Sequence, residues 1–344
     1  MGFRANIPDE VSFRCVRPRA FTLVELLVAM TVLVLMVTLL FSIVNQASTI
    51  WQRSRNEVGS YQSVRFAFNL MTRSLAQSRM NAYQGYDNDD APTKYIRKSD
   101  LEFVIDSPQG PPFFNQGNSV FFQAPLGQSD TASLSGLPGA LNTIGYYVTY
   151  GKDPNLPAFL STYDRNRFRL MQMLVPTEKM TVSAASSGST DIHAWYKNYI
   201  PTGTSSAPYV NVVANNVILL LCWPRLSEQE DPAGSALTQI QSGAYRYDSS
   251  SNSTQSPQPI TANQQPPLVQ VTFVAIDDVA ASRLPNTSDT PPQIKDALQG
   301  LFTNATVAQY KSDLATLESR LVNARIGYRI FNSNVALLEA KWTK

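Results

Sequence analysis

The feature that most constrains this chain is an apolar stretch near its N-terminus. From Phe21 to Val44 the sequence reads FTLVELLVAMTVLVLMVTLLFSIV, twenty-four residues that carry one charge. At about 1.5 Å per helical residue, such a helix crosses the roughly 30 Å hydrocarbon layer of a bilayer. A secretory signal peptide has a shorter apolar region and a small-x-small cleavage pattern, which is not seen after Val44. We therefore expect residues 21–44 to form a retained transmembrane helix.

The charges that flank this stretch predict its orientation. Four arginines lie within residues 1–20 against two acidic residues, and the next basic residue is Arg53. Because basic flanks are retained in the cytoplasm, the N-terminus is expected to be cytoplasmic and the rest of the chain to be exported.

Glu25 is the one charged residue in the apolar stretch. A carboxylate near the centre of a bilayer costs about 2.5 to 3.5 kcal/mol on insertion scales, and less near the edge, so by default it marks a functional position. Proteolysis between Ala20 and Phe21 would create an α-amine with a pKa of about 7.7 to 8 close to this carboxylate. Glu25 would then have a partner on its own chain or on a neighbouring subunit.

The sequence RAFTLVE at residues 19–25 resembles a class III prepilin signal, the cleavage and methylation motif of type IV pilins and type II secretion pseudopilins. The resemblance implies that a prepilin peptidase cuts after Ala20 and methylates Phe21 as the new N-terminus. It places Glu25 at the fifth position of the processed chain, where it serves assembly. The family usually has Gly in place of Ala20, but alanine is also small, and cleavage is still expected. The alternative is an ordinary signal anchor with a stray glutamate.

Removal of the leader, residues 1–20, changes the charge and the cysteine content. The full chain has 28 basic and 26 acidic residues, a formal charge of +2, and the processed chain keeps 24 of each. A neutral chain lacks the field that attracts phosphate, so no nucleic-acid partner is expected. The leader also takes Cys15 with it. Cys222 is then alone in an apolar run, where we expect a buried thiol and no intrachain disulfide.

Beyond the membrane stretch the sequence predicts an amphipathic helix followed by strands. Steps of three and four residues place one apolar set on a single helix face, namely Tyr61, Val64, Phe68, Met71 and Leu75. One helix is expected over about 22–80, of which 45–80 is the amphipathic continuation. Short runs rich in β-branched and aromatic residues predict strands at 101–106, 119–123, 144–150, 167–175, 216–223 and 268–276.

The exported region, residues 81–344, is expected to be an α+β domain in which the helix packs on an antiparallel sheet, with long loop insertions. Segment 224–267 is rich in Ser, Gln and Pro and predicts a flexible surface loop, not a second core. Apolar residues at heptad-like steps predict a late helix over about 307–321. The runs GYRIF and VALLEAKW predict closing strands.

The exported region also carries weaker resemblances over about a third of its length. Its order of helix, strands and Pro-rich loop resembles the J-type minor pseudopilins of type II secretion. The segments NNVILLLCWPRLS, LVQVTFVAIDDVAASRL and NARIGYRIFNSNVALLEAKW resemble the large pilin-like "Verru/Chthon cassette protein C" family. The resemblance implies a pilin-like fold and no catalytic residues.

Few residues are candidates for other chemistry. A single histidine, His193, leaves little scope for an imidazole metal site or a nucleophile–base pair, so neither enzyme activity nor a cofactor is expected. His193 is expected to be a surface or interface residue. Asp87, Asp89 and Asp90 offer oxygen ligands for Ca²⁺, yet they lack the ligand spacing and the glutamate of an EF-hand loop. A solvated turn is the alternative at these positions.

These features predict a structural minor subunit of a type IV pilus-like or type II secretion-like filament. An exported domain of roughly 260 residues is bulky for a shaft repeat, which favours a place at or near the tip. The expected partners are a prepilin peptidase, other pilin-like subunits, an assembly platform and a bacterial inner membrane crossed once. The bulk of the chain is expected in the periplasm or on an extracellular filament. The alternative function is an adhesin or substrate-binding module displayed on the membrane or at a tip.

Overall fold

The computed structural model describes residues 22–340, apart from residue 89, 108–116, 135, 158, 161, 163, 182–190, 202–207, 242 and 252. The chain divides into two compact units, Met1–Arg55 and Asn56–Lys344. Helix α1 (Leu23–Ala76) begins in the first unit and ends in the second. The two units are therefore taken one at a time.

The first unit consists, in its described part, of the N-terminal portion of α1. Residues Leu23–Trp51 form a helix long and apolar enough to cross a membrane, and none of its most apolar part is buried within the protein. The helix ends at Ala76, four residues earlier than the sequence predicts, because Arg79 leaves the helical path and forms a β-bridge with Gln123. The predicted apolar helix is confirmed.

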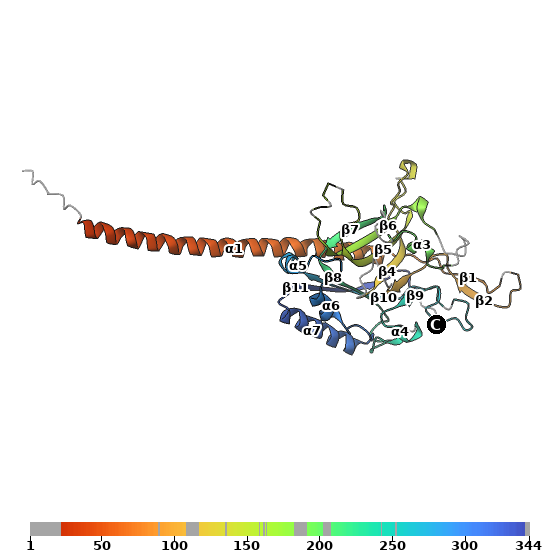
Figure 1. Ribbon diagram of the computed structural model, residues 1–344. Coiled ribbons are helices and arrows are strands. Elements are labelled where there is room, and N and C mark those ends of the chain that lie inside the picture. Colours follow the sequence, from red (N-terminus) through yellow and green to blue (C-terminus); the bar gives the residue numbers. More distant parts are fainter. Residues whose placement is uncertain are drawn as a thin grey trace, which may run out of the picture. The chain divides into compact units, whose positions relative to one another are not determined.

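The second unit contains a six-stranded sheet in the order β7-β6-β5-β4-β3-β9 (Figure 1). All of its pairs are antiparallel, and the longest runs from Thr143 opposite Val175 to Gly151 opposite Arg167. Its strands are β3 (Val104–Asp106), β4 (Ser119–Pro125), β5 (Leu141–Gly151), β6 (Arg167–Val175), β7 (Val210–Asn215) and β9 (Tyr247–Asp248).

A three-stranded antiparallel sheet, in the order β11-β10-β8, lies beside the first. Its strands are β8 (Val217–Arg225), β10 (Leu268–Ile276) and β11 (Tyr328–Ala336). A separate hairpin pairs β1 (Tyr83–Tyr86) with β2 (Tyr95–Lys98). The shorter helical elements are η1 (Ala132–Leu134), η2 (Thr177–Lys179), α3 (Ala194–Lys197), α4 (Ala236–Ile240), α5 (Asp278–Arg283) and α6 (Pro292–Leu298).

The C-terminal portion of α1 packs against both larger sheets. The five apolar residues predicted to share its inner face are all buried, from Tyr61 to Leu75. Phe68 meets Phe273 of β10 edge to face, with ring centroids 5.1 Å apart, and the Tyr146 hydroxyl of β5 donates to the Ser74 hydroxyl at 3.3 Å. The predicted packing of this helix on an antiparallel sheet is confirmed.

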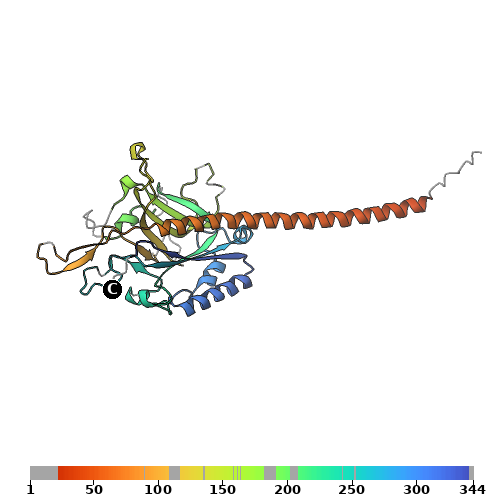
Figure 2. The same cartoon turned by 180° about the vertical axis from the view of Figure 1, so that it is seen from behind.

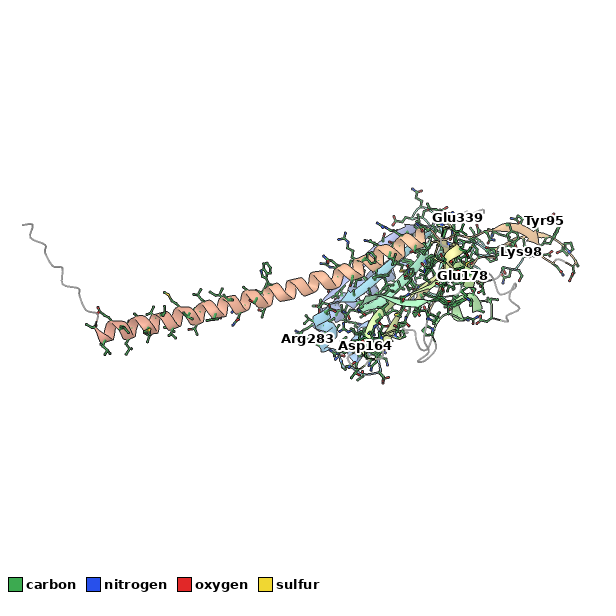
Figure 3. All side chains as sticks on the ribbon, turned by 90° about the horizontal axis from the view of Figure 1, so that it is seen from above. Tyr95, Lys98, Asp164, Glu178, Arg283 and Glu339 are labelled. Atoms are coloured by element: carbon green, nitrogen blue, oxygen red, sulfur yellow. The ribbon has the colours of Figure 1, made fainter. Side chains whose placement is uncertain are left out.

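The opposite face of the three-stranded sheet is covered by α7 (Val307–Asn323), seen as the blue helix in Figure 2. Thr306 caps this helix by accepting a hydrogen bond from the Gln309 backbone at 3.2 Å. Its buried stripe of Tyr310, Leu317 and Leu321 packs on β8 and β10. The outer face of the six-stranded sheet packs against α3 through Trp195 and Tyr196.

Glycine is required by the geometry at Gly117, just before β4. Its φ of +87° lies in the left-handed region, and an added Cβ would stand 2.3 Å from the Leu220 carbonyl oxygen of β8. A larger residue would have to displace backbone, so this position fixes the approach of the two sheets.

The structure corrects several predicted elements. The strand predicted at 101–106 begins at Val104, and the two closing strands are one strand, β11, because the chain turns after Ala336. Strands β7, β9 and the β1–β2 hairpin were not predicted. Segment 224–267 contains α4 and β9, and its Leu237, Tyr245 and Tyr247 are buried. The segment is therefore not wholly the surface loop that its composition predicts, because these apolar side chains join core clusters formed with other parts of the chain.

Candidate processing and assembly site

Glu25 lies in the first turn of α1 and forms a reciprocal hydrogen-bonded pair with Thr22. Its Oε2 accepts from the Thr22 backbone N–H and from the Thr22 hydroxyl, each at 3.0 Å. In return the Glu25 backbone N–H donates to Thr22 Oγ1 at 3.3 Å. This Thr-x-x-Glu arrangement is a capping box, which satisfies backbone donors at the start of a helix. The carboxylate is thus held at the helix N-terminus.

The helix whose first turn contains Glu25 exposes apolar side chains on all of its faces. Leu23 is 81% exposed, Leu33 57% and Phe41 65%. A contiguous apolar surface of this extent is unfavourable in water and marks contact with lipid or with other protein. The site therefore consists of one carboxylate in a fixed position and an apolar helix that must contact lipid or other protein.

Two of the predicted site residues, Ala20 and Phe21, lie outside the described residues. Their predicted processing stays a prediction. Thr22, the residue that follows them, is the first to be described and already belongs to the capping box. Sequence reasoning did not identify Thr22, although its spacing of three residues from a glutamate was available as a signal.

Comparison with known proteins supports the same site. Residues 16–41 match the prokaryotic N-terminal methylation motif, a span that includes Ala20, Phe21 and Glu25. No curated protein and no solved structure matches the chain. The chain therefore carries a class III prepilin-like motif followed by an apolar helix, which favours a structural role over a catalytic one. The match covers the motif alone, so the pseudopilin and cassette-protein resemblances of residues 81–344 stay predictions.

Two of the three aspartates considered for calcium, Asp87 and Asp90, lie in the turn of the β1–β2 hairpin, and the third, Asp89, lies outside the described residues. The Asp87 carboxylate accepts its hydrogen bonds from other residues of the turn. The donors are the Thr93 hydroxyl and the backbone N–H groups of Asn88, Thr93 and Lys94. These bonds, led by the Thr93 hydroxyl, lower the Asp87 pKa. Among the described residues, no group of three acidic, histidine or cysteine side chains is placed to hold a metal ion.

His193 lies at the start of α3 and pairs with β9. Its Nε2 is 3.2 Å from Asp248 Oδ2, and both side chains are largely buried. Burial alone would lower the His193 pKa, but the hydrogen bond and charge of Asp248 outweigh it and raise the pKa. The pair borders a cavity of about 190 Å³ that Asp106 and Arg246 also line. The imidazole is thus an interface residue within the chain, between α3 and β9.

Glu102 is a buried carboxyl next to this region that sequence reasoning missed. It is 7% exposed, and Trp195 Nε1 donates to its Oε2. Burial raises the Glu102 pKa to about 7, despite the opposing hydrogen bond from Trp195. The only sequence signal was a glutamate inside a predicted strand. The thiol of Cys222 is buried, as predicted, and burial raises its pKa.

Proposed function

We propose that this protein is a structural subunit of a pilin-like filament, made as a prepilin and cleaved between Ala20 and Phe21. The observation that carries the proposal is the methylation motif over residues 16–41, which overlaps the start of an apolar helix whose most apolar part is not buried within the protein. A prepilin peptidase removes the leader, and the helix is held in a bacterial inner membrane until assembly. The large second unit, with its long loops, suits a minor subunit near a tip.

Glu25 has a specific role in this proposal. The capping box holds its carboxylate at the helix start, hydrogen-bonded to Thr22, the residue that directly follows Phe21 in the sequence. In a bilayer or a helix bundle an unpaired carboxylate is costly, and a neighbouring positive amine removes much of that cost. Assembly driven by apolar contact between helices is thereby given a fixed register.

Processing is tested by mass spectrometry of protein extracted from membranes. Phe21 is expected at the N-terminus, carrying a methyl group, when the protein is produced with an active prepilin peptidase. Without the peptidase the chain should begin at residue 1. Recovery of the intact chain in the presence of an active peptidase would refute the processing step.

Glu25 is tested with two substitutions that separate its charge from its capping role. Glu25→Leu removes both, whereas Glu25→Gln keeps a side-chain oxygen that accepts from Thr22 and removes only the charge. Both variants should insert in the membrane at least as well as the wild type, and both should be lost from sheared filaments. If Glu25→Gln enters filaments like the wild type, charge pairing is not what Glu25 contributes.

A further inference from the structure

Strand β11 is an edge strand of the three-stranded sheet. It pairs with β10 over nine residues, from Tyr328 to Ala336, and no other described strand pairs with its second edge. In an antiparallel strand every second residue directs its N–H and C=O away from a given neighbour, so β11 presents a row of backbone groups outward. β11 contains no proline and a single charge, Arg329. Such an edge is a template for another strand.

An open groove of about 630 Å³ runs along this edge, between β11 and the C-terminal portion of α1. Figures 1 and 2 both show β11 between α1 and α7. The helix contributes Tyr61, Gln62, Arg65, Phe68 and Asn69, and the strand contributes residues 329–333. Phe331 packs beside Phe68, with ring centroids 5.9 Å apart, so the floor of the groove is aromatic.

The groove is positively charged. Its lining includes Arg65 and Arg329 and no acidic residue. Arg329 lies over the Tyr61 ring, 5.0 Å from its centroid, a contact that positions the guanidinium. In the described part of the chain neither arginine forms an ion pair with a carboxylate. Both arginines are exposed residues, so their charge is available to a ligand.

We propose that this groove binds an extended, acidic segment of a partner protein, which adds to the sheet as a fourth strand beside β11. Backbone pairing supplies affinity, apolar side chains of the segment contact Phe68 and Phe331, and its carboxylates pair with Arg65 and Arg329. Strand addition needs only the β11 edge and the groove, both in the second unit, so the inference goes beyond the proposed filament role.

The positive charge of the groove favours an acidic partner segment over basic segments of this chain. The chain's own N-terminal residues 1–20 carry four arginines against two acidic residues, so they are repelled. A second copy of β11 would bring another arginine and no carboxylate. Exposed Phe66, one helical turn from Gln62, extends the apolar contact available to a partner chain.

The test uses the processed full-length protein in detergent and a synthetic ten-residue peptide of alternating Glu and Val. Hydrogen exchange followed by mass spectrometry should show protection of amides in residues 328–336 when the peptide is added. Two control peptides separate the contributions: alternating Lys and Val, which reverses the charge, and the Glu peptide with alternate amides N-methylated, which cannot pair as a strand. Each control should bind at least tenfold more weakly.

The matching protein variant is Arg65→Glu combined with Arg329→Glu. It should lose at least tenfold affinity for the Glu peptide and gain affinity for the Lys peptide, which a merely unfolded variant would not do. Three results overturn the proposal: no protection of residues 328–336 by the Glu peptide, equal binding of the N-methylated peptide, or a dimer in sedimentation whose β11 amides are protected without any peptide. The last would assign the edge to a second copy.

Discussion

The two portions of helix α1 have the same secondary structure and opposite surroundings. In the first unit every described side chain of the helix is exposed, and the apolar residues occupy all of its faces. In the second unit Val64, Met71 and Leu75 are completely buried, while Arg65 and Arg73 on other faces are exposed. The apolar residues thus show no helical periodicity in the first portion and a clear periodicity in the second.

This difference shows which solvent each portion is suited to. A helix that is apolar all round gains nothing from one orientation over another and fits lipid or a bundle of like helices. A helix with a single apolar stripe needs one specific surface, which here is formed by the two sheets. Two experiments test this distinction directly, and a third tests the buried interior of the second unit alone.

The largest effect is expected from truncation. A chain that begins at about Gln46 keeps the buried stripe of α1 and should fold and stay soluble. A chain that begins at Asn81 lacks it and exposes the sheet faces that Phe68 and Met71 cover, so it should aggregate. Size-exclusion chromatography and thermal melting compare the two. Equal solubility and equally cooperative melting would show that α1 is dispensable for the core.

Single substitutions should show the same contrast at smaller scale. Met71→Ala removes a completely buried side chain and should lower the free energy of unfolding by about 2 to 5 kcal/mol. Leu33→Ala, at a position 57% exposed, should change it by less than about 0.5 kcal/mol. Denaturant unfolding of the full chain in detergent, followed by near-UV circular dichroism, provides the measurement. A similar loss for both variants would remove the distinction between the two portions.

The smallest effect concerns pH and lies wholly in the second unit. Burial raises the Glu102 pKa to about 7, so between about pH 5 and pH 7 the folded state holds a proton on Glu102 that the unfolded state has lost. The free energy of unfolding therefore falls as the pH rises from about 5 to 8. Glu102→Gln keeps an acceptor for Trp195 and removes the titration. At pH 8 the free energy of unfolding of this variant should exceed that of the wild type by about 2 kcal/mol, and at pH 5 the two values should differ little.

The matched control for this prediction is His193→Asn. The raised pKa of His193 also makes the folded state less stable as the pH rises, so part of the dependence should persist in Glu102→Gln and disappear in the double variant. Chemical denaturation at each pH measures the slopes. A parallel pH dependence in wild type and Glu102→Gln would show that Glu102 is ionised in the folded protein throughout this range.

Much of the fold was predictable because its signals are local. The limits of β6 and β10 match the predicted strands, and α7 begins at the predicted residue, because each of these elements carries an unbroken pattern of one period. β7 was missed because its run VNVVAN contains two asparagines and borders residues typical of loops. The buried tyrosines of segment 224–267 were missed because their partners, such as Phe103, lie far away in the sequence.

The candidate site was predictable to a different degree. The motif residues Ala20, Phe21 and Glu25 follow one another in the sequence, so a local pattern identifies them. Arg65 and Arg329 both line the groove beside β11, although they lie far apart in the sequence. No local sequence pattern indicates that the two arginines share a surface. Glu102 beside Trp195 and His193 beside Asp248 are likewise long-range pairs, which only the sheet topology brings together.

The contact between Phe68 and Phe273 has a consequence for how the chain is made. The two rings are separated by about 200 residues, and β10 and β11, which form this part of the surface under α1, both come from the last quarter of the sequence. At about 5 to 20 residues per second, the apolar stripe of α1 waits on the order of 10 to 40 s for its covering strands to be synthesised. During that interval Val64, Met71 and Leu75 are exposed and can contact any apolar surface. This face of α1 must therefore be shielded from aggregation until the last strands have been synthesised.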